Sequence, residues 1–171
     1  GSGWKAIHIP DGGNRNGFDE RSKDLLACDG GVKRTRLNVF LNGMDVFSFG
    51  ISRPPKSIKA LCEHLNLSMD SLDCLLLHQA NKYLTDKIAK RVGMPLEKCP
   101  HNIEEFGNTS SATIPLLMVT RLKEALRDRP LKMLGCAFGV GLSWGSVCFE
   151  TDNPVVSDLV LVEDDYAAVY A

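Results

Sequence analysis

The stretch Asp73-Cys74-Leu75-Leu76-Leu77-His78-Gln79-Ala80-Asn81 joins a short apolar run to a polar cluster. An apolar run of this length predicts a strand that is buried on both faces of a sheet. Apolar residues then recur every fourth position as far as Gly93, and this spacing predicts a helix. These residues are Ala80, Leu84, Ile88 and Val92. A buried strand followed directly by a helix indicates an α/β protein.

A long helical pattern precedes this strand. Asn42-Gly43 predicts a turn into the helix, and Asp45 is the expected N-cap because its carboxylate can accept from free N–H groups. Pro54 and Pro55 are expected to break or bend the helix, since proline has no N–H and its ring clashes with the preceding turn. Beyond them one apolar stripe continues at helical spacing through Ile58, Leu61, Cys62 and Leu65.

A third helix and two further strands are predicted downstream. The helix is expected to begin near Ser111, so that Pro115 lies in its first turn, where most N–H groups lack helical partners anyway. Residues 131–138 and 142–149 are apolar runs that predict two strands joined by Gly139-Val140-Gly141. The order of helices and strands again indicates an α/β fold.

The two ends of the chain are less regular. Turn-forming residues fill 11–17 and recur at 29–31, between two short candidate strands at 6–9 and 37–41. An acidic tail follows the last predicted strand and runs from Asp152 to Asp165, ahead of the final residues 166–171. We therefore expect three parts, which are a turn-rich start (1–42), a main domain (43–150) and an acidic tail (151–171).

Length and composition exclude several classes of protein. A chain of 171 residues is the size of one domain, and 44% hydrophobic with 24% charged residues is typical of a globular protein. A net charge of −1 favours neither nucleic acid nor a membrane surface, and no apolar run is long enough to span a bilayer. The start is not a signal peptide, and its Gly-Ser without Met suggests a piece of something longer.

The six cysteines predict a reduced, cytoplasmic protein. No pair has C-x-x-C spacing, and most cysteines lie in apolar runs, where a free thiol behaves as a small hydrophobic group. Cys62 with His64 and Cys99 with His101 form C-x-H pairs, but neither has a second pair at zinc-finger spacing. We therefore expect no metal site.

Three polar clusters are candidates for chemistry. They are His78-Gln79-Ala80-Asn81, the segment 107–113 and the segment 138–145. Each also has a purely structural interpretation: a single histidine in the core, a set of helix caps and a tight hairpin. The functional interpretation is that strand ends in α/β proteins hold ligands, and that a glycine-rich turn can point backbone N–H groups at an oxyanion.

Together the clusters carry a family resemblance. His-Gln-Ala-Asn at 78–81, Gly-Asn-Thr-Ser-Ser-Ala at 107–112 and Ala-Phe-Gly-x-Gly-x-x-Trp-Gly-Ser at 137–146 resemble the C-terminal half of β-ketoacyl-acyl-carrier-protein synthase III. The resemblance runs from about residue 43 to 149. It implies a thiolase-like half-domain with a mixed β-sheet, and a full enzyme that condenses an acyl-CoA with malonyl carrier protein, losing CO₂ and using no cofactor.

The resemblance also implies roles for individual residues. His78 and Asn108 match the catalytic pair that donates hydrogen bonds to the malonyl thioester oxygen during decarboxylation, and both side chains can donate. Gly139, Val140 and Gly141 match the oxyanion loop, although the family usually has glycine at the middle position. Asn81, Lys90 and Arg91 match positions that bind the substrate or the acidic carrier protein. For the basic residues a solvated helix face, with pairs such as Asp86–Lys90, is the alternative.

The family's cysteine nucleophile has no clear counterpart. Cys28, in Ala27-Cys28-Asp29-Gly30, superficially resembles its context, but no apolar helix follows it and it precedes His78 by only fifty residues. We therefore expect the nucleophile to be missing and the chain to be inactive alone.

The partners implied are the missing N-terminal half-domain, an acyl carrier protein and a second copy in a homodimer. An apolar face near His78 and Asn108 should mark where the other half packs. Two alternatives stay open: a non-catalytic module that binds acyl carrier protein or acyl-CoA, and a condensing enzyme of secondary metabolism.

Overall fold

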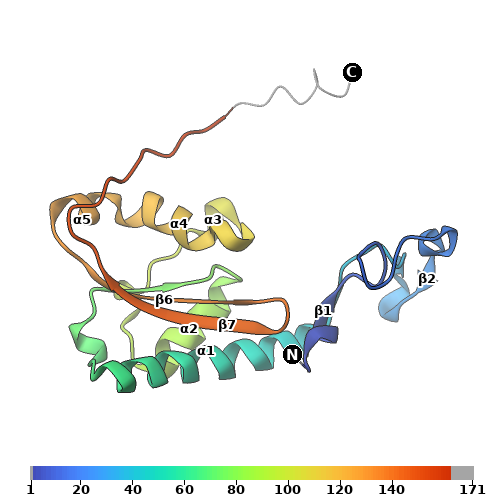
Figure 1. The fold of residues 1–171 in the computed structure, drawn as a ribbon, viewed down its shortest axis with the longest axis horizontal. Coiled ribbons are helices and arrows are strands. Elements are labelled where there is room, and N and C mark those ends of the chain that lie inside the picture. Colours follow the sequence, from blue (N-terminus) through green and yellow to red (C-terminus); the bar gives the residue numbers. More distant parts are fainter. Residues whose placement is uncertain (1, 163–171) are drawn as a thin grey trace.

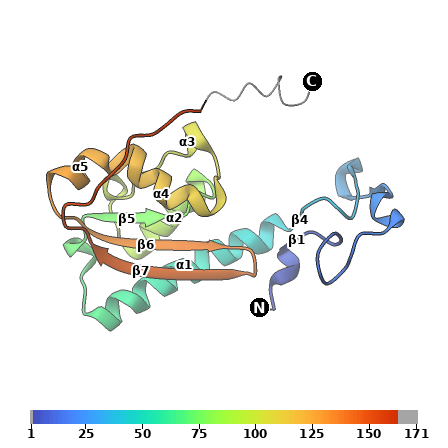
Figure 2. The same cartoon turned by 45° about the horizontal axis from the view of Figure 1, so that its top comes forward.

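The computed structural model describes residues 2–162, and its main body consists of three layers (Figure 1). The central layer is a sheet in the order β5-β6-β7, with β5 (Cys74–Leu77) parallel to β6 (Lys132–Gly139) and β6 antiparallel to β7 (Ser143–Glu150). One face carries α1 (Gly43–Leu65) and α2 (Lys82–Val92). The other carries α4 (Thr113–Leu117), a π-helical turn (Met118–Leu122) and α5 (Lys123–Asp128), with the short α3 (Ile103–Phe106) nearby (Figure 2).

Alternate residues of the buried strands face the two helical layers. Leu75 and Leu77 pack with Ile58 of α1 and Ile88 of α2, whereas Leu76 packs with the helices of the opposite face. All four residues of β5 are buried, as the apolar run predicts. A strand that is covered on both faces of a sheet needs a continuous apolar run, which β5 has. The predicted order of strand, helices and hairpin in the main body is confirmed.

The helix α1 differs from its prediction in two respects. Its N-cap is Asn42, whose Oδ1 accepts from the Asp45 N–H at 3.2 Å, so Asp45 lies in the first turn instead. The helix also continues without interruption through Pro54 and Pro55, and the predicted break is wrong. Both prolines are buried, so packing against the body outweighs the two hydrogen bonds that their missing N–H groups would make. No described helix is long and apolar enough to cross a membrane.

The third helical region begins as predicted but contains an irregular turn. A 3₁₀ turn at Ser110–Ala112 leads into α4, and Pro115 lies in the first turn of that helix. The π-helical turn then separates α4 from α5. The remaining short 3₁₀ helices are Trp4–Ala6, Glu20–Lys23, Asp29–Gly31, Met69–Ser71 and Leu96–Lys98.

Residues 2–42 form an arm that projects from the body (Figure 1). Two of its strands, β1 (Ile7–His8) and β4 (Phe40–Leu41), pair antiparallel where the sequence predicts strands, and β2 (Leu26–Ala27) pairs with β3 (Lys33–Arg34). The arm is held by the buried carboxylate of Asp11, which accepts from Arg36 at 2.6 and 2.8 Å and from the Ser22 hydroxyl at 2.9 Å.

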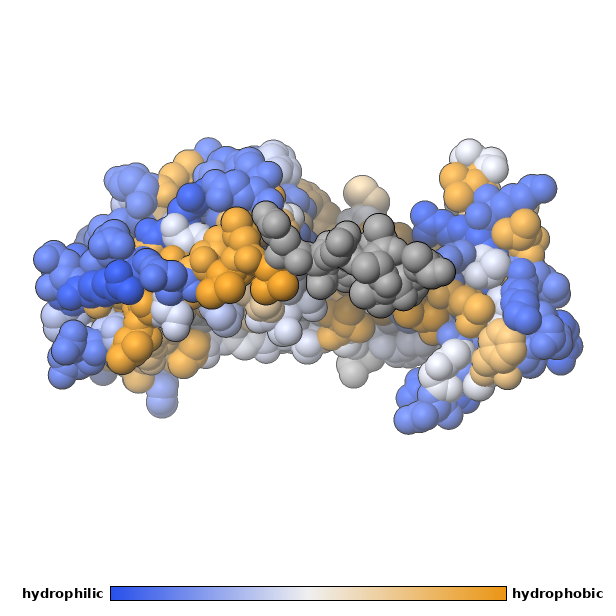
Figure 3. Space-filling view, turned by 90° about the horizontal axis from the view of Figure 1, so that it is seen from above, coloured by the Kyte–Doolittle hydropathy of each residue, from blue (hydrophilic) through white to orange (hydrophobic). Residues whose placement is uncertain are grey.

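The tail after β7 runs along α5 without regular structure. Thr151 N–H donates to the Leu131 carbonyl at 3.0 Å, and Arg127 donates to the Val156 carbonyl at 2.8 Å. Apolar side chains at 159–162 are exposed just before the end of the described chain (Figure 3). The rest of the predicted acidic tail, from 163 onward, lies outside the described residues.

The Asp73 carboxylate links the start of β5 to the start of β6. It accepts from the Lys132 N–H and from Arg129, each at 2.8 Å, and the hydrogen bond from Arg129 is the main cause of a lowered Asp73 pKa. A carboxyl group with a lowered folded-state pKa stabilises the fold above its ordinary pKa of 3.8, and this stability is lost as the pH falls through the folded value.

We therefore expect Asp73→Asn to lower the free energy of unfolding at pH 7 by on the order of 1 kcal/mol. The difference from the parent protein should shrink below pH 4 as the parent's carboxylate is protonated. Urea unfolding of both proteins at pH 7 and pH 3 measures this. Asp70→Asn, an exposed change in the preceding turn, is the control. An Asp73→Asn deficit that is equal at both pH values would contradict the assignment.

Candidate active site

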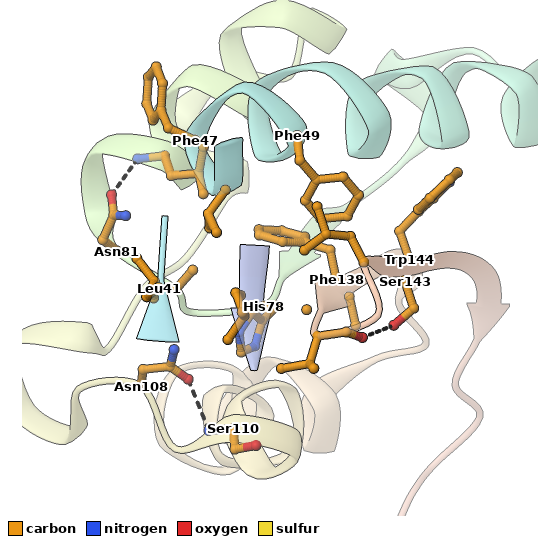
Figure 4. A pocket seen from close by; sticks show the side chains of 18 of the residues that line it. Leu41, Phe47, Phe49, His78, Asn81, Asn108, Ser110, Phe138, Ser143 and Trp144 are labelled. Atoms are coloured by element: carbon orange, nitrogen blue, oxygen red, sulfur yellow. Dashed lines mark hydrogen bonds between the residues drawn. The ribbon is translucent and has the colours of Figure 1, made fainter. Parts of the chain in front are cut away.

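A cavity of about 970 Å³ opens where the body meets the base of the arm (Figure 4). β5 and β6 are parallel, so their carboxyl ends lie at the same edge of the sheet, and His78 and the β6–β7 hairpin extend from that edge into the cavity. The N-terminal part of α1 forms one wall and the segment 108–111 forms another. The polar residues of the lining are His78, Asn81, Asn108, Ser110, Ser111 and Ser143.

His78 is held in one orientation by a hydrogen bond of its backbone and by two contacts of its ring. Its backbone N–H donates to the Cys136 carbonyl at 3.0 Å, which continues the β5–β6 pairing by one residue. The ring meets the Phe138 ring edge-on, with centroids 5.4 Å apart, and its Nδ1 lies 2.8 Å from the Thr113 hydroxyl. Burial lowers the pKa of His78, so the imidazole is neutral at pH 7.

Asn108 presents its amide nitrogen to the cavity. Its Oδ1 accepts from the Ser110 N–H at 3.0 Å. This bond occupies the acceptor end of the amide, and Figure 4 shows the nitrogen on the side of the cavity. Among the described residues none accepts from its Nδ2, so the side chain has a free donor, as the role implied by the resemblance requires.

The hairpin turn is only partly in the cavity. Gly139 and Val140 line it, whereas Gly141 lies outside the lining and Leu142 takes its place. Val140 is 64% exposed, and its carbonyl accepts from the Ser143 hydroxyl at 2.7 Å. The backbone φ of Val140 is not positive, so valine is accommodated without strain at a position where a left-handed conformation would have required glycine.

Aromatic side chains from α1 form the wall opposite His78. Phe49 lies edge-on to Trp144, with ring centroids 5.6 Å apart, and Arg53 sits 5.7 Å from the centre of the Trp144 ring. Phe47 stacks on Tyr83 of α2 at 5.9 Å. No sequence pattern predicts this aromatic wall, although Phe47 and Phe49 stand close to the predicted start of α1.

The cavity has an apolar rim. Leu41, Val140 and Trp144 line it and are each about half exposed or more. The apolar face that the sequence analysis expects near His78 and Asn108 is therefore present.

Of the expected binding residues, only Asn81 lines the cavity. It also caps α2, because its Oδ1 accepts from the Leu84 N–H at 2.8 Å. Lys90 and Arg91 are exposed in the last turn of α2, about 14 Å further along the helix axis at 1.5 Å per residue. Asp86 pairs with Lys82 at 2.9 Å rather than with Lys90, its partner in the alternative of a solvated helix face.

Gln79 serves the fold rather than the cavity. Its side chain is buried, donates to the Leu77 carbonyl at 2.8 Å and accepts from the Asn102 N–H at 3.4 Å. These bonds secure the loop after β5 against the segment that leads to Asn108. The second residue of the His-Gln-Ala-Asn motif therefore positions the segment that carries the first and last.

The described cysteines do not reach the cavity. Cys28 is exposed in the arm, where its sulfur lies 3.8 Å from the Leu26 carbonyl. Burial raises the pKa of Cys62, Cys74 and Cys136, and it raises the pKa of Cys99 to about 12, so these thiols are protonated at pH 7. His101 of the second C-x-H pair bonds to Glu104 instead. Between residues 2 and 162 no group of three acidic, histidine or cysteine side chains is placed to hold a metal ion.

The arrangement can stabilise negative charge without a charged side chain. A neutral imidazole and an amide nitrogen are directed into a cavity with apolar walls, where hydrogen bonds to an oxyanion are stronger than in water. A three-layer α/β body with His78 at a strand end, and with Asn108 lining the same cavity, is typical of the thiolase-like fold class.

More particularly, the chain belongs to the family described as "3-Oxoacyl-[acyl-carrier-protein (ACP)] synthase III C terminal", whose model matches residues 62–151. A β-ketoacyl-[acyl-carrier-protein] synthase III of Lactococcus lactis is 36% identical over 138 residues, and one of Streptococcus equi subsp. zooepidemicus is 43% identical over 119. The crystal structure of a 3-oxoacyl-(acyl-carrier protein) synthase from Burkholderia xenovorans is similar over 92% of this chain, with a TM-score of 0.80 and 34% identity.

These matches cover most of this chain but less than half of the relatives. The alignments include 80% of this chain and 42% of the Lactococcus lactis protein, 65% and 36% for the Streptococcus equi protein, and 92% and 44% for the Burkholderia xenovorans structure. The chain is therefore equivalent to the C-terminal part of its relatives.

Proposed function

We propose that this chain is the part of a 3-oxoacyl-[acyl-carrier-protein] synthase III that supplies the decarboxylation donors, His78 and Asn108. The enzyme would condense an acyl thioester with malonyl carrier protein and release CO₂. One observation carries the proposal. The neutral imidazole of His78 and the amide N–H of Asn108 lie in the same apolar cavity. The names of its relatives support the same reaction.

The proposed chemistry requires two donors and no cofactor. The bond between the malonyl carboxylate and the α-carbon breaks, and its electron pair passes into the thioester carbonyl, whose oxygen becomes negative. His78 and Asn108 would donate to that oxygen. The carbanion equivalent then attacks the acyl thioester, a carbon–carbon bond forms and the thiolate leaves. Neutral donors suit the step because they stabilise the enolate without protonating it.

The hairpin turn would serve the second half of the reaction. A backbone N–H from 139–141 can donate to the tetrahedral intermediate of acyl transfer, and the side chain at 140 does not remove that group. Val140 instead lines the cavity, as Trp144 does. We infer that it affects which acyl chains are accepted more than the mechanism.

The nucleophile would come from outside the described residues. Cys28 is exposed in the arm and outside the cavity lining, so it does not fit the role of acyl carrier. The chain is therefore proposed to be inactive alone and to depend on a part equivalent to the N-terminal portion of its relatives. The apolar rim supports such packing, and a homodimer of the assembled, cytoplasmic enzyme is part of the same proposal.

Two alternatives use the same cavity. A non-catalytic module that binds carrier protein or acyl-CoA would have no need of paired oxyanion donors, and this counts against it. A condensing enzyme of secondary metabolism stays open, because the fold is also similar to a priming β-ketosynthase of the R1128 polyketide pathway, with a TM-score of 0.58 and 26% identity. Comparing acetyl-CoA with longer acyl-CoA primers would separate the two pathways.

A chimera tests the proposed function. In the chimera, this chain replaces the matched C-terminal part of the Burkholderia xenovorans synthase. The N-terminal part is the synthase's own. We expect the chimera to release CO₂ from malonyl carrier protein and to form a 3-oxoacyl product. A folded chimera that binds malonyl carrier protein yet releases no CO₂ would contradict the proposal and favour a binding module.

The basic end of α2 offers a separate test of carrier-protein docking. Within the described part of the chain, neither Lys90 nor Arg91 forms an ion pair with an acidic side chain, so both are available to an acidic partner. We expect the double variant Lys90→Glu with Arg91→Glu in the chimera to raise KM for malonyl carrier protein by about tenfold, with kcat little changed. Lys59→Glu, an exposed change on α1, is the control. If Lys59→Glu raised KM as much as the double variant, Lys90 and Arg91 would have no specific role in docking and would lie on a merely solvated face.

A further inference from the structure

The Thr113 hydroxyl has two competing partners in the wall of the cavity. Its Oγ1 lies 2.8 Å from His78 Nδ1 and 3.0 Å from the Ser110 carbonyl. Thr113 is buried, with 2% of its surface exposed, so solvent water does not offer its hydroxyl a further hydrogen-bond partner. A hydroxyl has a single hydrogen, and the direction in which it donates determines what His78 Nδ1 must do.

The two directions give opposite imidazole tautomers. If the hydroxyl donates to Ser110, Nδ1 must carry the proton and donate to Oγ1, which leaves Nε2 as a bare acceptor. If the hydroxyl donates to Nδ1, the proton resides on Nε2. Burial keeps the ring neutral at pH 7, so one nitrogen has the proton and the other does not.

The surrounding bonds favour donation to His78. The Ser110 carbonyl already accepts the backbone N–H of Thr113, so it keeps a partner when the hydroxyl turns away. Nδ1 has the Thr113 hydroxyl as its described hydrogen-bond partner, and the Nδ1–Oγ1 distance is the shorter of the two. The 2.8 Å to Nδ1 is the usual length for a hydroxyl donor, whereas the 3.0 Å to the Ser110 carbonyl is at the long end of that range.

We infer that Thr113 is a positioning residue that fixes the tautomer of His78, with its hydroxyl donating to Nδ1 and the ring proton held on Nε2. Thr113 itself does not touch the proposed substrate. The inference deepens the proposed function, because only this tautomer turns a neutral imidazole into a donor for the thioester oxygen. It also gives Thr113, otherwise a first-turn residue of α4, a role in the site.

Nitrogen-15 NMR of the histidine side chains tests the tautomer directly in this chain, without any activity. Spectra would be recorded near pH 8.5, about two units above the ordinary histidine pKa. Comparison with His78→Gln assigns the His78 signals. His8 is an internal reference of the opposite kind, because its Nδ1 lies 3.0 Å from the Lys5 carbonyl and must donate. We expect a protonated Nε2 and a bare Nδ1 for His78.

Thr113→Val removes the hydroxyl while it keeps the shape of the side chain, and Thr113→Ser restores the hydroxyl. We expect the valine variant to lose the single-tautomer pattern and the serine variant to keep it. In the chimera, the valine change should lower kcat for decarboxylation with KM unchanged, and serine should restore it.

A protonated Nδ1 in the parent chain would overturn the inference, and so would an unchanged tautomer in folded Thr113→Val. The NMR result needs no turnover, so an inactive chimera would count against the proposed function and leave the tautomer measurement to decide the role of Thr113.

Discussion

His78→Ala and Asn108→Ala are each expected to lower the rate of malonyl decarboxylation by the chimera by about 10²–10³-fold, the usual effect of removing one preorganised oxyanion donor. The loss should fall on kcat, because the donors act on charge that develops only in the transition state. Release of labelled CO₂ from malonyl carrier protein measures it. The double variant should lose less than the product of the two single effects, because both donors serve one oxygen.

The matched control for His78→Ala is His64→Ala, because His64 is exposed near the end of α1 and outside the cavity lining. We expect the control to retain full activity. A folded His78→Ala chimera that decarboxylates within twofold of the parent would remove His78 from the mechanism and would leave it as a structural histidine.

Leu75→Ala is expected to lower the free energy of unfolding by about 3 kcal/mol, within the range for truncating a fully buried leucine. Leu75 has no exposed surface and lies in the middle of β5, packed between the sheet and the layer of α1 and α2. Few neighbours can move into the space because strands and helices surround it. Urea unfolding measures the change.

Leu65→Ala at the end of α1 provides the comparison for Leu75→Ala. Leu65 is 44% exposed, so its truncation should cost less than about 1 kcal/mol. If both changes cost the same, β5 would not be the centre of the core as described, and the three-layer arrangement around it would need revision.

The main body could be predicted because its elements obey simple periodicities. β5 is a continuous apolar run, and α2 repeats an apolar residue every fourth position up to its C-cap Gly93. The details of α1 could not be predicted in the same way. Whether a proline interrupts a helix depends on what its ring packs against, and the burial of Pro54 and Pro55 is a tertiary property that no local pattern contains.

The polar part of the site could be located from the sequence, and its walls could not. His78 and the turn after β6 come together because the carboxyl ends of neighbouring parallel strands meet at one edge, and Asn108 lines the same cavity from the loop after α3. The aromatic wall comes from α1, whose approach to the hairpin is set by packing. The His78–Thr113 bond joins residues 35 positions apart, and the local pattern around Thr113 indicates only helix caps.

The central claim is that this chain contributes the decarboxylation half of a site and needs another part for acyl transfer. Mixing the chain with a separately produced N-terminal part of the Burkholderia xenovorans synthase tests it most directly, with 3-oxoacyl product as the readout. We predict no condensation by either part alone and His78-dependent condensation by the mixture. Condensation by this chain alone would contradict the claim, and Cys28 would then be the first residue to replace.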